Sequence, residues 1–216
     1  MAVITISHQI GSGGREIGQR VANVLGYPYI DQEIVQGVAA RLGVSEDEAV
    51  NHDEKAESLI SQIIASLGYS SLGGPVFINA EVAAEITRQN WMNYNKYQEA
   101  TQQVIETMSA QGNVVIAGHG ANFYLEGRKG VLSVFIYADA DTRVKTLMGR
   151  DQVDHTRAAK MVHDNDNDRS HYIKTLYKAD WCDRSHYLLL VNTGLASPEL
   201  AASLIVQAAH SIEAAV

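Results

Sequence analysis

VITISHQIGSGGREIG, residues 3–18, joins a β-branched apolar run to a glycine-rich loop, and the loop leads into a helical pattern that extends to Leu25. Glycines allow backbone N–H groups to converge on one point, and the dipole of a helix adds partial positive charge at its N-terminus. A buried strand, a glycine loop and a helix N-terminus in this order predict a phosphate-binding site. We expect its contacts, mainly through backbone N–H groups, from Gly11, Ser12, Gly13, Gly14 and Arg15.

The end of this loop differs from a Walker A sequence, in which the last residues are Gly-Lys-Ser/Thr. The corresponding residues here are Gly13, Gly14 and Arg15, so the lysine is missing. Two interpretations stay open. Arg15 supplies the charge that the lysine normally provides, or the loop binds an anion without transferring anything.

Composition limits the class of protein. The chain has 216 residues, 46% of them hydrophobic and 19% charged, which suits one globular core with room for an inserted subdomain. A formal net charge of −8 disfavours binding to nucleic acid or to an anionic membrane. No apolar run reaches the roughly 18 residues that a membrane span requires. The single cysteine, Cys182, fits a reducing compartment, so we expect a cytoplasmic protein.

Apolar runs with helical patterns between them predict an α/β fold. Several runs are almost continuously apolar, as is typical of parallel strands that are covered on both faces. The five expected strands are residues 3–7, 28–31, 113–117, 131–138 and 187–192.

Two long intervals between the strands carry helical patterns. The first, between the second and third strands, we interpret as an inserted helical subdomain, and its long helical run at residues 79–111 is a candidate surface for a homodimer. The second interval covers residues 139–178 and precedes the last strand.

A set of motifs runs along the whole chain in a defined order. They are GSGGREIG at 11–18, PYIDQE at 28–33, VIAGHGAN at 115–122, VLSVFIYADADTRV at 131–144, DNDR at 166–169 and a late tryptophan, Trp181. Together they resemble the cytidylate kinase-like family of P-loop proteins. The resemblance implies a single P-loop kinase-like domain over residues 1–216, with three α/β/α layers and a five-stranded parallel sheet in the order 2-3-1-4-5. It also implies a core at 1–40 and 113–216, a helical acceptor-binding insertion at about 41–112, and an arginine-bearing lid at about 139–178.

The resemblance further implies an ATP-dependent phosphotransferase that moves the γ-phosphoryl group to a nucleoside monophosphate, CMP or dCMP. The cofactors would be ATP and Mg²⁺. Arg15 stands where a Walker serine or threonine would ligate the metal, so we expect no protein metal site, and Mg²⁺ held mostly by phosphates and water. Two alternatives remain: a nucleotide-binding regulatory module without transfer, and a kinase of another small hydroxylated metabolite, because a fold does not determine the substrate.

Candidate catalytic residues come from strand ends and from the lid. Asp31 ends the second strand, where its carboxylate could orient or deprotonate an acceptor or cap the next helix. Phosphoryl transfer needs cations over the developing charge, and we select Arg143 and Arg169, of which Arg169 matches an arginine of the family. The alternative is that these arginines pair with the many neighbouring aspartates.

Two histidines stand where family members usually have arginine. They are His8, after the first strand, and His119, after the third. In the order 2-3-1-4-5 these strands are neighbours, so we expect both side chains beside the phosphate loop. Titratable groups in place of permanent cations would make phosphate binding weaker near pH 7 and dependent on pH. The alternative is a purely structural, hydrogen-bonded role for both.

Overall fold

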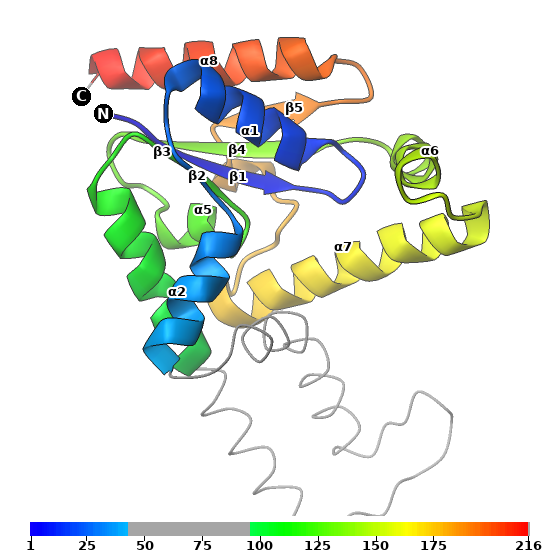
Figure 1. Cartoon of the computed structure of the whole chain (residues 1–216), viewed down its shortest axis with the longest axis horizontal. Coiled ribbons are helices and arrows are strands. Elements are labelled where there is room, and N and C mark those ends of the chain that lie inside the picture. Colours follow the sequence, from blue (N-terminus) through cyan, green and yellow to red (C-terminus); the bar gives the residue numbers. More distant parts are fainter. Residues whose placement is uncertain (43–95, 216) are drawn as a thin grey trace, which may run out of the picture. The chain divides into compact units, whose positions relative to one another are not determined.

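The structure is a computed structural model that describes residues 1–42 and 96–215 (Figure 1). The chain divides into two compact units. One comprises Met1–Asp31 and Ile105–Val216, and the other comprises Gln32–Val104. The first unit contains the expected phosphate loop and the expected lid. Most of the expected insertion, and about half of the candidate dimer surface at 79–111, lie outside the described residues.

A parallel five-stranded sheet forms the centre of the first unit. Its strands are β1 (Val3–His8), β2 (Tyr29–Ile30), β3 (Val114–Ala117), β4 (Val131–Tyr137) and β5 (Leu189–Asn192). They lie in the order β2-β3-β1-β4-β5 and all neighbouring pairs are parallel. The α/β class expected from the sequence pattern and the strand order implied by the family resemblance are both confirmed. This order places β1 at the middle of the sheet, so that its carboxyl end lies between the ends of β3 and β4.

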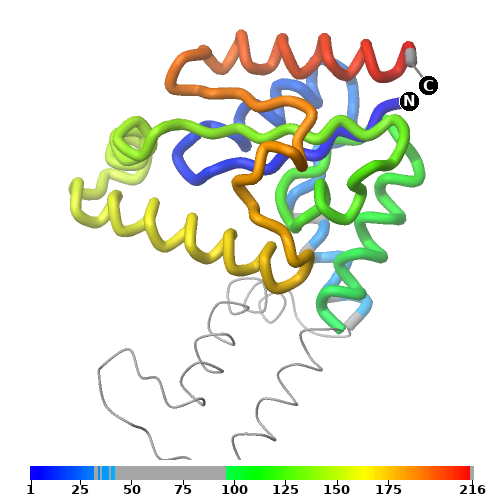
Figure 2. Tube along the Cα trace, turned by 180° about the vertical axis from the view of Figure 1, so that it is seen from behind, coloured from blue at the N-terminus to red at the C-terminus, as the bar shows by residue number. Residues whose placement is uncertain are grey.

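Helices cover both faces of this sheet (Figures 1 and 2). On one face, α1 (Gly14–Leu25) and α8 (Pro198–Ala215) pack on a core that includes Ile4, Ile6 and Ile205. Alternate residues of a strand point to opposite faces, and Phe135 of β4 accordingly joins the other core.

That second core is aromatic. Phe135 packs there with Phe123 of α5 (Ala121–Tyr124), Ile173 of α7 (His155–Tyr177), Trp181 and Tyr187. The segment from α7 back to the sheet includes a short 3-10 helix, η1 (Arg184–His186).

The expected lid consists of two helices, α6 (Ala140–Asp151) and α7. Aspartates begin both helices. Asp139 accepts a hydrogen bond from the Thr142 backbone N–H at 2.8 Å, and Asp154 accepts one from the Arg157 backbone N–H at 2.8 Å. These are ordinary N-cap interactions, in which a carboxylate oxygen satisfies a first-turn amide. A small apolar cluster that includes Leu147 packs α6 against α7.

The second unit is described for residues 32–42 and 96–104. It contains α2 (Gln32–Leu42) and the first part of a helix that covers residues 96–110. Ile34, Val38 and Val104 are fully buried, and a Cβ added to Gly37 would lie 3.0 Å from a methyl group of Val104. Among the helices of the described part of the chain, none combines the length and the apolar character that crossing a bilayer requires.

Candidate active site

The glycine loop follows β1 and leads directly into α1. Gly11 and Gly13 have φ angles of +77° and +76°, in the left-handed region that favours glycine. Between them Ser12 is buried, and its hydroxyl donates a 2.7 Å hydrogen bond to the Gln9 carbonyl. The Ser12 backbone N–H also donates to this carbonyl, at 3.2 Å. Ser12 therefore closes the loop on itself, and its contact with a phosphate stays a prediction.

The N-terminus of α1 presents its first-turn amides with no side-chain cap. Gly13 is the N-cap residue, and glycine has no side chain that could accept their hydrogen bonds. The first N–H groups of a helix have no partner within the helix and, together with its dipole, they favour an anion. Such amides can bind a phosphate group, and this role of Gly14 and Arg15 stays a prediction.

His8, the last residue of β1, packs on this helix N-terminus. A Cβ added to Gly14 would lie 2.3 Å from the Cβ of His8. Burial is the main cause that lowers the pKa of His8 from 6.5 to about 3, and the positive charges of Arg169 and Arg15 lower it further. The imidazole is therefore neutral at pH 7. The expectation that His8 titrates near neutral pH is wrong for the free protein, because burial and two nearby cations disfavour the imidazolium.

The Asp31 carboxylate, just after β2, contacts Arg15 at the start of α1 and lies near His119, which follows β3. Its Oδ2 lies 2.9 Å from Nε and 2.8 Å from Nη2 of Arg15, and its Oδ1 lies 4.0 Å from Nε2 of His119. His119 has a φ of +53°, an uncommon conformation for a residue with a side chain. The structure thus groups Arg15, Asp31 and His119 at the carboxyl ends of neighbouring strands, as the sequence places them.

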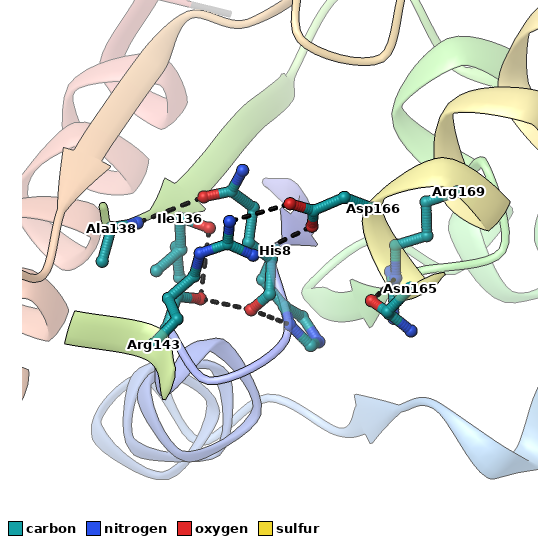
Figure 3. Close-up of polar contacts among 9 residues, drawn as sticks. His8, Ile136, Ala138, Arg143, Asn165, Asp166 and Arg169 are labelled. Atoms are coloured by element: carbon teal, nitrogen blue, oxygen red, sulfur yellow. Dashed lines mark hydrogen bonds and ion pairs between the residues drawn. The ribbon is translucent and has the colours of Figure 1, made fainter. Parts of the chain in front are cut away.

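Arg143 of α6 is buried beside the loop (Figure 3). Its Nη1 and Nη2 donate to the two carboxylate oxygens of Asp166 at 2.9 and 2.8 Å. A Cβ on Gly11 would lie 2.7 Å from the Arg143 carbonyl oxygen, so the loop also touches the backbone of α6. Because its terminal nitrogens are paired, contact between Arg143 and a transferring group stays a prediction.

Arg169 of α7 lies near enough to His8 for its positive charge to lower the pKa of the imidazole. Its Nε donates a 3.1 Å hydrogen bond to Asn165 one turn earlier, and its Cζ lies 5.9 Å from the centre of the Trp181 ring. The other two lid arginines are exposed: Arg150 pairs with Asp151, and Arg157 follows the start of α7.

Several of these partners do not stand out in the sequence. Asp166 is one of many aspartates near the lid, and only its spacing of three residues from Arg169, which places both on one helix face, distinguishes it. Asn122, inside the motif VIAGHGAN, accepts a 2.8 Å hydrogen bond from the Ser7 hydroxyl beneath the site. The Tyr187 hydroxyl donates to the Trp181 carbonyl at 2.7 Å, which fixes the residue under the Arg169 guanidinium.

The parallel 2-3-1-4-5 sheet, with a glycine loop leading into α1 after β1, defines a P-loop kinase fold. Solved structures share it. An uncharacterized protein from Eubacterium ventriosum is 19% identical with a TM-score of 0.66, covering 98% of this chain and 99% of that chain. A shikimate kinase from Bacteroides thetaiotaomicron is 13% identical with a TM-score of 0.51, covering 98% of both chains. A gluconokinase from Sinorhizobium meliloti is also 13% identical with a TM-score of 0.51, covering 98% and 95%.

The sequence places the chain more narrowly than the fold does. The chain belongs to the cytidylate kinase-like family, whose model matches residues 3–195. No curated protein matches the sequence.

Proposed function

We propose that this chain is an ATP-dependent phosphotransferase that acts on a small acceptor, with CMP or dCMP as the acceptor that the family suggests. One observation carries the proposal. The positive charges of Arg15 in α1 and Arg169 in α7 both lower the pKa of His8, and His8 packs on the N-terminus of α1. Two guanidinium groups therefore lie near uncapped helix amides, which is the arrangement that a transferring phosphoryl group requires.

On the donor side, the amides of Gly14 and Arg15 would hold a phosphate, and Arg169 would stabilise the charge that develops during transfer. ATP would supply the phosphoryl group, and Mg²⁺ would neutralise part of the charge of its phosphates. Among the described residues no three His, Cys, Asp or Glu side chains are grouped as metal ligands. Mg²⁺ readily keeps several of its waters, so a site made mostly of phosphates and water suits these surroundings.

On the acceptor side, Asp31 is the candidate that orients the attacking group. Its carboxylate is held by Arg15 and lies near His119. A carboxylate in this position can accept a proton from an alcohol. This observation favours the second candidate function, a kinase of a hydroxylated metabolite, because the oxygen of a nucleoside monophosphate that attacks is already ionised at pH 7. Two proteins of the same fold are a shikimate kinase and a gluconokinase.

The third reading, a nucleotide-binding module without transfer, is favoured by the pairing of Arg143 with Asp166 and by glycine at position 14. Both reduce the positive charge that is free to meet a phosphate.

Consumption of ATP with Mg²⁺ across a panel of acceptors separates these functions. The panel contains CMP, dCMP, UMP, AMP, GMP, nucleosides and hydroxylated metabolites such as shikimate and gluconate. Turnover with CMP or dCMP supports the first proposal, and turnover with a metabolite alcohol alone supports the second. Measurable ATP binding with no turnover on any acceptor contradicts both and favours the binding module.

A further inference from the structure

Compared with a Walker A sequence, the loop has a large residue near its start where that sequence has glycine, and a glycine near its end where that sequence has lysine. A Walker A sequence has the spacing Gly-x-x-x-x-Gly-Lys-Ser/Thr. Residues 8–15 align with it so that His8 stands at the first glycine, Gly13 at the second, and Gly14 at the lysine. The side chain is thus present where Walker A has none, and absent where Walker A has its lysine.

The structure gives a physical reason why the two changes occur together. A Cβ on Gly14 would lie 2.3 Å from Cβ and 2.4 Å from Cγ of His8, far inside van der Waals contact. Gly14 is the first residue of α1 and does not have a positive φ, so its backbone conformation does not require glycine. Its close approach to His8 does. Any side chain at position 14 and a Cβ at position 8 exclude each other.

We propose that the imidazole of His8 is the side-chain ligand of the phosphate bound at the N-terminus of α1, in the space that a lysine at position 14 would occupy. The inference rests on the proposed function and specifies its donor site. His8 as a residue is partly exposed, and the positive charges of Arg15 and Arg169 both lower the pKa of its ring. Its Nδ1 lies 3.4 Å from the Gln9 carbonyl, and Nε2 makes no hydrogen bond to the described residues. With the ring proton on Nε2, this nitrogen would donate a hydrogen bond to a phosphate oxygen.

The ligand set then differs from that of a Walker A loop in where its charge lies. A lysine carries the cation on the loop itself. Here the loop residue contributes a nitrogen of an aromatic ring, and the permanent cations belong to Arg15 at the start of α1 and Arg169 on α7.

The packing half of the inference is tested by thermal unfolding without nucleotide. We expect Gly14→Ala to lower the Tm by about 2 to 10 °C, because it overpacks a filled site. The double variant H8G/G14A should unfold within about 2 °C of H8G alone, whereas H8A/G14A should stay well below H8A, because alanine keeps the Cβ that clashes. Gly149→Ala is the matched control: this glycine is also helical, but its added Cβ meets nothing within 4 Å, so its Tm should not fall.

Two results would contradict the proposed clash between positions 8 and 14. One is an equal recovery of the Tm in H8A/G14A and H8G/G14A, and the other is a G14A variant whose Tm does not fall.

The ligand half is tested by titration with Mg²⁺ and ATP. We expect H8G to bind ATP about tenfold or more weakly than the wild type, and H8G/G14K to bind about tenfold more tightly than H8G, since a hydrogen bond to a charged group has about that effect. G14K alone should not bind. Wild-type affinity in H8G would overturn this inference alone. Failure of the wild type itself to bind ATP would overturn the proposed function, and this inference with it.

Discussion

Arg143 and Asp166 form a bidentate ion pair that joins α6 to α7 beside the phosphate loop. The Arg143 side chain is 5% exposed and that of Asp166 is 29% exposed. Removal of one partner from a buried pair leaves the other charge uncompensated, which typically costs about 3–5 kcal/mol, whereas an exposed pair contributes about 0–1 kcal/mol. The partial exposure of Asp166 places this pair between those limits.

We therefore predict that Asp166→Asn lowers the free energy of unfolding by about 2 kcal/mol. Asp164→Asn, on the same helix, removes an exposed pair with Lys160 and should cost less than about 0.5 kcal/mol. Urea denaturation of both variants measures the difference. Equal losses would mean that the buried pair does not hold the two helices together.

Asp31→Asn tests the acceptor side. Its ion pair with Arg15 is partly exposed, so the loss of stability should stay below about 1 kcal/mol. If the acceptor is an alcohol, kcat should fall about 100-fold or more, because general-base catalysis contributes about that factor. With a nucleoside monophosphate the loss should be smaller than about tenfold. Steady-state kinetics with the acceptor found in the panel measures kcat, and an unchanged kcat with an alcohol would remove Asp31 from the reaction.

His8 makes the stability of the free protein depend on pH. Its pKa is 6.5 in the unfolded chain and about 3 in the folded one, so the unfolded chain binds more protons between these values. Stability is therefore highest above pH 6.5 and falls as the pH is lowered toward 3, by at most about 1.4 kcal/mol per pH unit.

Between pH 6.5 and pH 5 we predict that the wild type loses about 1 kcal/mol more stability than His8→Gln, with allowance for screening at a residue that is partly exposed. Urea denaturation at the two pH values measures it, with His155→Gln, an exposed histidine of α7, as the control. The same pH dependence in wild type and His8→Gln would show that the His8 ring is not held neutral by its surroundings.

Alanine substitutions at Gly120 and Gly127 distinguish the cost of backbone strain from the cost of overpacking. Their φ angles are similar, +70° and +74°, but an added Cβ at Gly120 would lie 2.6 Å from the Tyr177 ring, whereas at Gly127 it meets nothing within 4 Å. Alanine in the left-handed region costs about 1–2 kcal/mol at either position. We predict a further loss of about 1–3 kcal/mol for Gly120→Ala from overpacking against the end of α7, measured by urea denaturation. Equal losses in the two variants would contradict this contact.

The strands could be predicted almost completely from their apolar runs and their order from the family resemblance, and the differences are local. The second strand is two residues long instead of four, because β2 is an edge strand with one neighbour. The fifth begins at Leu189 instead of Tyr187, because the Tyr187 ring packs in the aromatic core and its backbone follows η1. Runs of residues fix which segments are strands, but the ends depend on neighbours that the sequence does not display.

The site could be predicted only in part. Residue type and position in the sequence are enough to identify the glycine loop, Arg15, Asp31 and Arg169 as candidates. The contact between His8 and Gly14 depends on how the end of β1 meets the start of α1, and the five intervening residues do not reveal it. The choice of Asp166 as the partner of Arg143 depends on how α7 is rotated against α6. The neutral state of His8 likewise follows from burial and from the charges of Arg169 and Arg15, which only the fold brings near the ring.

The most direct test of the central claim, that lid arginine and phosphate loop form one transfer site, is kcat for acceptor-dependent ATP consumption in Arg169→Ala. We predict that kcat falls about 100-fold or more while the KM for ATP changes less than about threefold, because the guanidinium acts mainly on the charge of the transition state. Arg157→Ala, an exposed arginine on the same helix, should keep the wild-type kcat. A kcat in Arg169→Ala equal to that in Arg157→Ala would contradict the account.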